Sequence, residues 1–373
     1  MSFTLFKYAP HEVGVNTLYL EGAEVIRGFT SAMWIERYRT AGEFTIIAPV
    51  SSGFRQSLPL GTLISHMGTQ ELMIVESHEI QDNLDGDVEI KITGRSFETF
   101  MENRILSYNG VSGAGGFPIP ANQAVESYYL TGSGTAAEHA LEIMEWHLYD
   151  GGILSAQHIT NCRTVNTVPG AVGTSTTREI DIDTVYKVVL DLLAIDDLGI
   201  RSVRPGANSG LPLSTDVGFI LHKGEDKTSS VAFDHASGDI RSGQYLWTLK
   251  NKKTAALAQG KAYRAIRTAT ASTGYDLRAG YVSTDVDTGN LTNDTNALNA
   301  AADSYLAQHK ETNIVRVEVS PTTNRLRYRE DYNVGDTVAV TGNYDTQGVM
   351  RVVEHVEIID ETGQSSYPTL ETV

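Results

Sequence analysis

The stretch YREDYNVGDTVAV, Tyr328 to Val340, changes within a few residues from charged and aromatic side chains to an apolar alternation. This pattern predicts a strand, a turn at Gly335 and Asp336, and a second strand in which Val338 and Val340 share one face. On its N-terminal side, NIVRVEV and RLRYRE are joined by SPTTN, which predicts a hairpin. On its C-terminal side, VMRVVEHVEI alternates until Glu354 interrupts it. Strands this short, separated by turns, indicate a small barrel or sandwich.

A second group of strands is predicted near the N-terminus. VEIKIT, Val88 to Thr93, alternates between apolar and polar residues, and ELMIVESHEI precedes it. The linking DNLDGD contains Asp85 and Gly86, a pair that suits a hairpin turn with positive φ. Calcium-binding loops place carboxylates at alternating positions, and this segment does not, so we expect a hairpin.

Helical spacing of apolar residues dominates the middle of the chain. Four stripes predict helices: Phe97, Phe100, Met101 and Ile105 behind Ser96 as N-cap; Ala137, Leu141, Met144 and Leu148; Val185, Val188, Val189, Leu192 and Leu193; and Leu298, Ala302, Tyr305 and Leu306, the last in a helix at about 293–309. The Gly-rich NGVSGAGGFPIPANQ indicates a boundary near residue 108. We therefore expect a β-rich α+β fold with a first β domain at 1–107, a helical α+β middle domain at 108–215 and a second β-rich domain at 216–373.

The composition narrows the class of protein. A chain of 373 residues with 41% hydrophobic residues can build two to four packed domains. Cys162 is the single cysteine, which excludes an intramolecular disulfide framework and a Cys-rich zinc site and fits synthesis in a cytoplasm. The N-terminus lacks a signal-peptide pattern, and no stretch reaches eighteen uninterrupted apolar residues. The net charge of −17 argues against general attraction to phosphate backbones.

One stretch, YYLTGSGTAAEHAL, has the spacing of a dinucleotide-binding turn at Gly132, Gly134 and Ala137. The surrounding sequence lacks the repeated strand and helix alternation that a parallel sheet requires. The favoured interpretation is therefore a flexible approach to a helix N-terminus, and we predict no cofactor.

Other polar residues raise the possibility of metal binding or acid–base chemistry. The histidines His139, His147 and His158 with Cys162 could form a mixed metal site, but no further cysteine completes a familiar pattern. The acidic pairs Asp181 with Asp183 and Asp196 with Asp197 flank a predicted helix, where solvated carboxylates favour the helix ends. We therefore predict neither a metal nor a catalytic residue, and no enzymatic activity.

A basic run stands out against the acidic background. Between residues 250 and 267 there are six basic residues and no acid, namely Lys250, Lys252, Lys253, Lys261, Arg264 and Arg267. The run is consistent with a solvated strand face or with a partner-contact patch. Without interleaved aromatic residues for base stacking, a protein partner is favoured over DNA.

Several motifs in sequence resemble one known family. They are WIERYRTAGEFTIIAP, GRSFETFMENRIL, LGIRSVRP, SVAFDHASGDIRSGQYLWTLKN and DYNVGDTVAV. Their order and spacing resemble the siphovirus Gp37-like family of phage tail proteins over nearly the whole chain, although the loops 109–122 and 161–177 match nothing in it. The motif residues to which the resemblance assigns structural roles are Trp34, Glu36, Arg37, Tyr38, Gly42, Phe44, Gly94, Arg95, Arg104, Tyr332, Gly335 and Asp336. Of these, the three arginines are expected to form structural ion pairs.

The resemblance implies a baseplate hub at the distal end of a phage tail. Such hubs are homotrimers in which each subunit supplies two β-barrel-like tube domains, here with the helical α/β middle region inserted, so that three copies imitate the six-fold tail tube. The implied partners are the tail tube, distal tail, tape measure and tail-tip fibre or receptor-binding proteins. Three chains of −17 would carry about −51, and an acidic lumen would let DNA pass without binding it. The alternative is a receptor- or carbohydrate-binding tail-tip protein, in which exposed tyrosines would stack on sugars.

Overall fold

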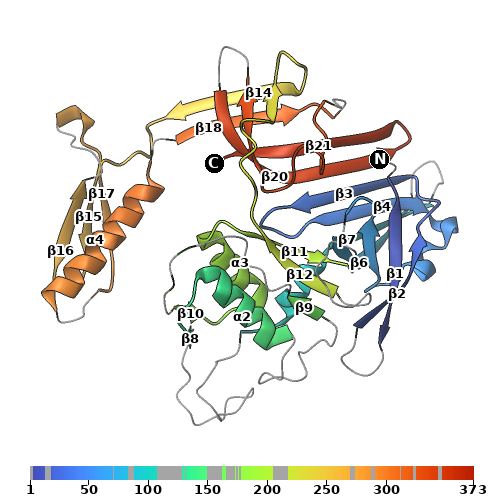
Figure 1. Ribbon diagram of the computed structural model, residues 1–373, viewed down its shortest axis with the longest axis horizontal. Coiled ribbons are helices and arrows are strands. Elements are labelled where there is room, and N and C mark those ends of the chain that lie inside the picture. The colour runs from blue at the N-terminus through green and yellow to red at the C-terminus, as the bar shows by residue number, and fades with distance from the viewer. Residues whose placement is uncertain are drawn as a thin grey trace, which may run out of the picture.

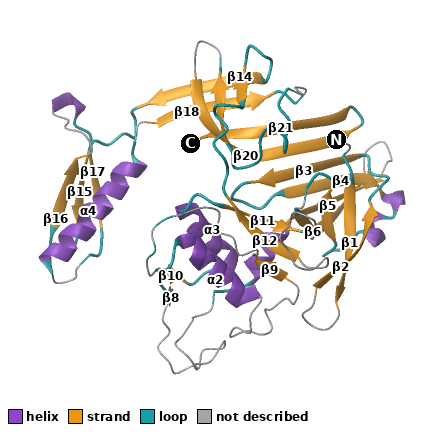
Figure 2. Cartoon of the chain, viewed as in Figure 1, coloured by secondary structure: helices purple, strands orange, loops and turns teal. Residues whose placement is uncertain are grey.

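The computed structural model shows a long β-sheet, a helical unit below it and a smaller unit at one side (Figures 1 and 2). The residues that it describes are 3–12, 18–69, 71–82, 88–106, 128–130, 132–148, 162–164, 173, 175, 178–204, 217–268, 274–286, 290–310, 312–321, 325–342 and 347–373.

The largest element is a 13-stranded sheet. Its main path has the order β14-β18-β21-β20-β3-β4-β7-β6-β5-β1-β2, with β19 and β13 attached through β20. The strands are β1 Leu5–Glu12, β2 Leu18–Val25, β3 Ser31–Arg37, β4 Glu43–Pro49, β5 Leu63–His66, β6 Leu72–Asp82, β7 Val88–Ser96, β13 Ala232–Asp234, β14 Ile240–Thr248, β18 Thr312–Val319, β19 Thr337–Thr341, β20 Gln347–Asp360 and β21 Gly363–Thr372. A short 3-10 helix, η1 Val50–Ser52, and α1 Phe54–Ser57 follow β4.

The two β regions expected from the sequence share this sheet. Strand β3 pairs antiparallel with β4 on one edge and with β20 on the other, with Ile35 opposite Val356. The β-rich α+β class is therefore confirmed, and the antiparallel strands alternate buried and exposed residues as such sheets do. Among the described strands the sheet does not close into a barrel.

The predicted hairpin of residues 313–330 is wrong. Strand β18 pairs with β14 and β21 instead, and residues 325–330 form turns. The alternating arginines that suggested a strand are held by side-chain bonds: Arg325 to Asp239, and Arg329 to Glu36. The first half of the opening stretch is thus not a strand. Its second half is as predicted, because Gly335 turns with φ of 100° and β19 then buries Val338 and Val340.

Two details of the strand predictions are explained by pairing. Strands β6 and β7 form the predicted hairpin, with Asp82 opposite Val88, while Asp85 and Gly86 lie outside the described residues. In β20 the register shifts between Val352 and Glu354, where Glu354 interrupts the apolar alternation. The bulge directs Glu354 to Arg37 on β3, with 2.7 Å between Oε2 and Nε.

A helical unit packs below the sheet, in the middle of the chain. It contains η2 Phe97–Asn103, α2 Ala136–Leu148, α3 Val185–Ile195, the sheet of β11 Gly199–Val203, β12 Val217–His222 and β9 Cys162–Thr164, and the pair β8 Tyr128–Leu130 and β10 Glu179–Asp181. The predicted stripes of α2 and α3 form its core. Strand β12 pairs with β11 across the boundary expected at residue 216.

The helix expected after Ser96 is a 3-10 helix, and Ser96 does not cap it. Its hydroxyl donates to Glu71 instead, because both groups are buried and need partners. The prediction of solvated acids around α3 is wrong for Asp196, which is 7% exposed and accepts a hydrogen bond from the Ala137 amide at the start of α2. The predicted flexible helix approach at Gly132 and Gly134 thus leads into a helix end held by a buried carboxylate.

A third unit stands apart on the left of Figure 1. Strands β16 Arg264–Thr268, β15 Ala255–Gln259 and β17 Ala279–Ser283 form a small sheet, and η4 Gly274–Asp276 precedes β17. Helix α4 Leu291–Gln308, which confirms the helix predicted at about 293–309, packs Leu298, Ala302 and Leu306 on one face of this sheet.

The N-cap of α4 provides a first prediction. The Asn290 side chain accepts hydrogen bonds from the amides of Thr292 and Asn293, at 2.9 and 3.2 Å. Asn290→Ala is expected to lower the free energy of unfolding of this unit by about 1 kcal/mol, because two amides lose their acceptor. Urea unfolding followed by hydrogen exchange in α4 measures it. Asn290→Asp should retain wild-type protection, and equal losses in both variants would contradict the capping role.

Candidate functional site

The buried carboxylate of Glu36 lies where the N-terminal and C-terminal strands of the large sheet meet. It projects from β3, and its side chain is 7% exposed. Trp34 Nε1 donates to Glu36 Oε1 at 3.1 Å, and the Tyr328 hydroxyl donates to Oε2 at 2.6 Å. The Arg329 guanidinium forms an ion pair with the same carboxylate. Burial alone would raise the pKa of Glu36, but Arg329 and these donors outweigh it and lower the pKa to about 2.

Two buried histidines complete this cluster. His355 on β20 lies opposite Glu36 in the β3–β20 pairing, and its ring stacks on Tyr328 with centroids 3.7 Å apart. His66 on β5 packs on Phe3, and its Nε2 is 3.6 Å from Glu357 Oε2. Burial lowers the pKa of His355 to about 3, and burial and Arg329 lower that of His66 to about 4. Both rings are therefore neutral at physiological pH.

Two further carboxyl groups lie buried next to this cluster, toward the helical unit. Glu71 accepts a hydrogen bond from Ser96, and Glu98 accepts one from the Ser202 amide at 3.3 Å. Burial and the neighbouring charges of Glu36 and Glu98 raise the pKa of Glu71 well above its usual range, and burial raises that of Glu98 to about 7. The junction thus keeps one carboxylate charged, paired with arginine, and favours the neutral form of the others.

The histidines make stability depend on pH. A buried histidine whose pKa is lowered from 6.5 to about 4 stays neutral while the unfolded chain takes up a proton, so stability is lost as pH falls below 6.5. Relative to the wild type, His66→Phe is expected to gain about 2 kcal/mol in free energy of unfolding between pH 7 and pH 5. Urea unfolding of both proteins across this range measures the difference. A difference that stays constant with pH would contradict this assignment.

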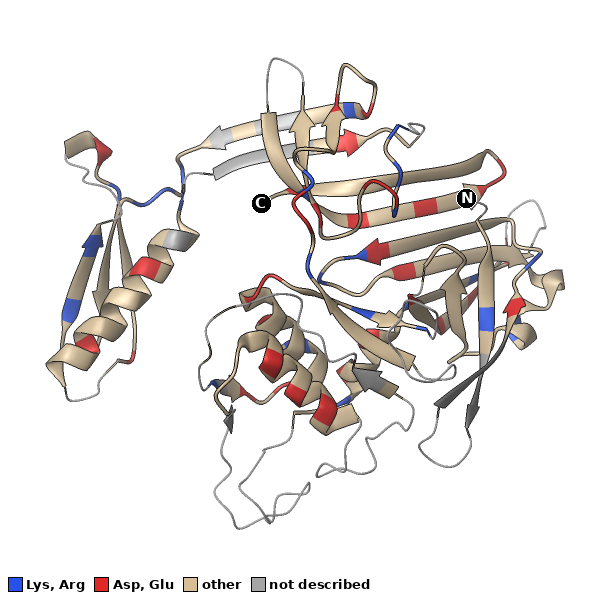
Figure 3. Ribbon diagram, in the orientation of Figure 1, with Lys and Arg blue, Asp and Glu red and all other residues tan. Residues whose placement is uncertain are grey.

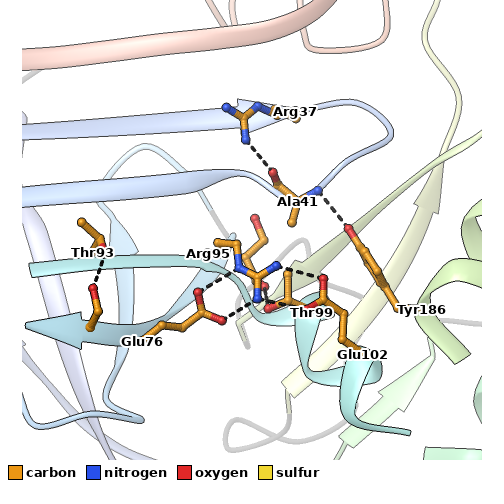
Figure 4. A network of polar contacts seen from close by, with 10 residues as sticks. Arg37, Ala41, Glu76, Thr93, Arg95, Thr99, Glu102 and Tyr186 are labelled. Atoms are coloured by element: carbon orange, nitrogen blue, oxygen red, sulfur yellow. Dashed lines mark hydrogen bonds and ion pairs between the residues drawn. The ribbon is translucent and has the colours of Figure 1, made fainter. Parts of the chain in front are cut away.

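Two of the expected arginines, Arg95 and Arg37, form ion pairs. Figure 4 shows the pairs of Arg95 and the bond of Arg37 to the Ala41 carbonyl oxygen. Arg95 on β7 binds both carboxylate oxygens of Glu76 on β6 and of Glu102 in η2, at 2.8–3.0 Å. Arg37 on β3 bonds Glu43, Glu354 and the Ala41 carbonyl oxygen. The planar guanidinium of Arg95 forms two bidentate pairs and connects β6 and β7 to the helical unit, whereas Arg37 bonds each of its partners through a different nitrogen and connects β4 and β20.

A third contact joins the C-terminal strands to the helical unit. The Tyr38 hydroxyl, just after β3, donates to the Asp197 carbonyl oxygen at 2.6 Å, and the Asp197 carboxylate pairs with Arg39 and with Arg351 of β20. The Tyr38 ring covers Gly335, where a Cβ atom would lie 2.5 Å from it. The residue after Gly335 also fixes a loop, since the Asp336 carboxylate accepts from the amides of residues 225 and 333, both at 2.8 Å.

The remaining motif residues pack in the cores around these contacts. Phe44 stacks on Trp34 with ring centroids 6.2 Å apart, and Arg104 lies over the Phe100 ring. Tyr332 meets Phe233 edge-on, at 5.5 Å. Gly42 and Gly94 lie so close to neighbouring strands that a Cβ atom would meet the carbonyl oxygens of Ile35 and Ile74. The motif residues thus lie within the sheet and at its junctions with the other units.

The basic run is not gathered into one patch. Lys250, Lys252 and Lys253 precede β15, and Lys261 lies in the turn between β15 and β16. On β16, Arg267 bonds Asp303 of α4, whereas Arg264 is exposed two residues before Ile266. The strand therefore directs its arginines to opposite faces.

The metal site considered from the sequence is not assembled in the described part of the chain. No cluster of three or more His, Cys, Asp or Glu residues that could hold a metal ion occurs among the described residues. His139 and His147 are buried on α2, where His147 Nδ1 is 2.7 Å from the Ile143 carbonyl oxygen, and His158 lies outside the described residues. None of the described helices is both long and apolar enough to cross a membrane.

Several residues of the junction were missed from the sequence. The family motifs included Glu36 among the structural residues, but they did not include its partner Arg329 or the nearby Glu71, Glu98 and His66. A signal existed in RLRYRE, because any of its three closely spaced arginines that becomes buried needs an acidic partner. The identity of that partner could not be read from the sequence, because Arg329 and Glu36 are 293 residues apart.

One family model matches nearly the whole chain. A family model described as Siphovirus ReqiPepy6 Gp37-like protein matches residues 15–370. No curated protein matches the chain in a sequence comparison.

Solved structures share the fold along nearly their whole length. A tail protein from Neisseria meningitidis MC58 has a TM-score of 0.55 and 13% identity, covering 100% of this chain and 97% of that one. The 43 kDa tail protein of prophage MuSo2 from Shewanella oneidensis has a TM-score of 0.59 and 11% identity, covering 98% and 97%. Prophage tail protein gp18 from Listeria monocytogenes EGD-e has a TM-score of 0.50 and 9% identity, covering 99% and 94%. At these identities the likeness establishes the fold.

Proposed function

Because the chain belongs to the siphovirus ReqiPepy6 Gp37-like family of phage tail proteins, we propose that it is the structural hub at the distal end of the tail. In this role three copies form a ring that joins the six-fold tail tube and the distal tail ring to the host-contacting tip. The ring surrounds the channel for DNA ejection. The chain has no enzymatic part in this function.

The observation that carries this proposal is the sheet that unites the two β regions of the chain. A trimer can match a six-fold tube when each subunit presents two β units at fixed relative positions. Here the β3–β20 pairing and the buried Glu36–Arg329 pair hold the N-terminal and C-terminal strands together. The fixed spacing supports the proposal that residues 1–107 and 216–373 supply two tube domains, with 108–215 as the middle domain.

The charge of the chain suits a channel for DNA. Each chain carries −17, so three carry about −51. Carboxylates on the channel wall would repel phosphates, so that the genome slides through without binding. The partners in this position are the tail tube, distal tail, tape measure and tail-tip fibre or receptor-binding proteins, and the protein reaches the virion after synthesis in the host cytoplasm.

Immunogold electron microscopy of phage particles tests this function. Antibody against the chain should place gold at the distal tip of the tail, and antibody absorbed with the purified chain is the matched control. Image reconstruction of the labelled tip should then show three copies. Gold along the tube only, or none on particles while the lysate contains abundant protein, would overturn the hub.

A further inference from the structure

Among the described residues, no helix or strand covers one face of the small sheet in the outlying unit. Leu257 on β15 pairs with Ile266 on β16 and with Tyr281 on β17, so these three side chains form one row across the sheet. Helix α4 packs on the opposite face, against Ala256, Ala258 and Ala265. Ile266 is 71% exposed and Tyr281 is 55% exposed. An apolar row without a cover is a feature of interaction surfaces.

The charge around this face differs from that of the rest of the chain. Residues 249–310 hold eight basic and five acidic residues, a net charge of +3, whereas the remainder holds 21 basic and 41 acidic residues, a net charge of −20. Arg264 lies on the uncovered face, because it is two residues before Ile266 on the same strand. A partner for this face should therefore combine acidic side chains with an exposed apolar one.

The outer side of helix α2 has this combination. Glu138, Glu142 and Glu145 follow one another at helical spacing, while the opposite side of the helix is buried in the core. Trp146 beside them is 41% exposed. Figure 3 shows acidic residues along this helix and basic residues on β16 of the outlying unit.

We propose that the uncovered β16–β15–β17 face of one copy docks on the outer side of helix α2 of a neighbouring copy. The two surfaces stand well apart within one chain (Figure 1), so in this conformation they can meet only between copies. Such a contact joins different surfaces of the two copies, and a head-to-tail contact of this kind can close into a ring. The inference rests on the trimeric assembly in the proposed function and assigns a surface to it.

The size of the face limits its role. Three strands about 4.8 Å apart, with five residues of about 3.3 Å each, cover roughly 240 Å². A stable interface buries about 800 Å² per partner. The contact therefore orients neighbouring copies within a larger interface, and its charge pairing makes assembly dependent on salt.

Sedimentation velocity of the full chain, at low and high salt, tests the contact by charge reversal. Arg264→Glu in one variant, and Glu142→Lys with Glu145→Lys in another, are each expected to weaken self-association at least about tenfold. Combining the three substitutions should restore it, because the reversed charges again attract. Arg55→Glu, at an exposed site on the first β region, is the control and should leave association unchanged.

Three results would overturn the inference: a wild-type chain that stays monomeric, reversal variants that associate like the wild type, or a combined variant that remains as weak as the single ones. None of them bears on the tail-tip location that immunogold labelling measures. A tail-tip label with unaltered association of the variants would therefore reject this contact and retain the hub.

Discussion

Replacing Arg329 by methionine is expected to lower the free energy of unfolding by about 3–5 kcal/mol, because it leaves the buried carboxylate of Glu36 without its compensating charge. The Glu36 and Arg329 side chains are 7% and 18% exposed, so water can solvate neither well. Tyr328 and Trp34 would still donate hydrogen bonds to the carboxylate, but neither carries a positive charge. Urea unfolding at pH 7 measures the loss.

The chain contains a matched control two residues away. Arg327 pairs with Glu330 at 3.0 Å, but these side chains are 66% and 48% exposed. Arg327→Met should change the free energy of unfolding by less than about 1 kcal/mol, because an exposed ion pair is only slightly more stable than the same two charges solvated separately. The double variant Glu36→Gln with Arg329→Met should recover much of the loss. Similar losses for Arg327→Met and Arg329→Met would refute a special role for the buried pair.

Gly94→Ala is expected to cost about 3 kcal/mol, because the added methyl group has no room between the central strands. Its Cβ atom would lie 1.8 Å from the Ile74 carbonyl oxygen and 2.6 Å from Phe44 Cε1. One neighbour is the backbone of β6 and the other is a buried ring, so this steric clash can be relieved only if the strands of the sheet move. The shift of the urea midpoint and of the melting temperature measures the cost.

Gly132→Ala is the comparison, since nothing lies within 4 Å of a Cβ atom there. This change should alter stability by no more than about 0.5 kcal/mol. If both alanine variants unfold at the wild-type midpoint, the close approach of β6 and β7 at Gly94 is not a constraint on the fold.

Local patterns predicted local structure well. The apolar stripes of α2, α3 and α4 and the alternation before and after Gly335 each describe one element and its buried face. The sequence patterns failed to predict which strands pair with each other. NIVRVEV carries a strand pattern, but that pattern does not specify whether the next segment or β14 and β21 lie beside it.

The arginines of RLRYRE show the same limit for the site. Their alternation with Leu326 and Tyr328 suggested a strand, yet each has a different partner: Arg325 binds Asp239, Arg327 binds Glu330 and Arg329 binds Glu36. Only the second of these is local in sequence. The motif resemblance placed Glu36 among structural residues, but its surroundings arise from contacts among β3, β5, β20 and the 325–336 turns that periodicity cannot describe.

The pairing of β3 with β20 also has a consequence during synthesis. Arg37 and Glu354 are separated by 317 residues. At a translation rate of about 5 to 20 residues per second, the edge of β3 that pairs with β20 stays unpaired for roughly 15 to 60 s after β3 is synthesised. During that time it is a free strand edge able to pair with other nascent chains. A chain that terminates before β20 leaves this edge uncovered, so β20 must be synthesised before the large sheet can form as described.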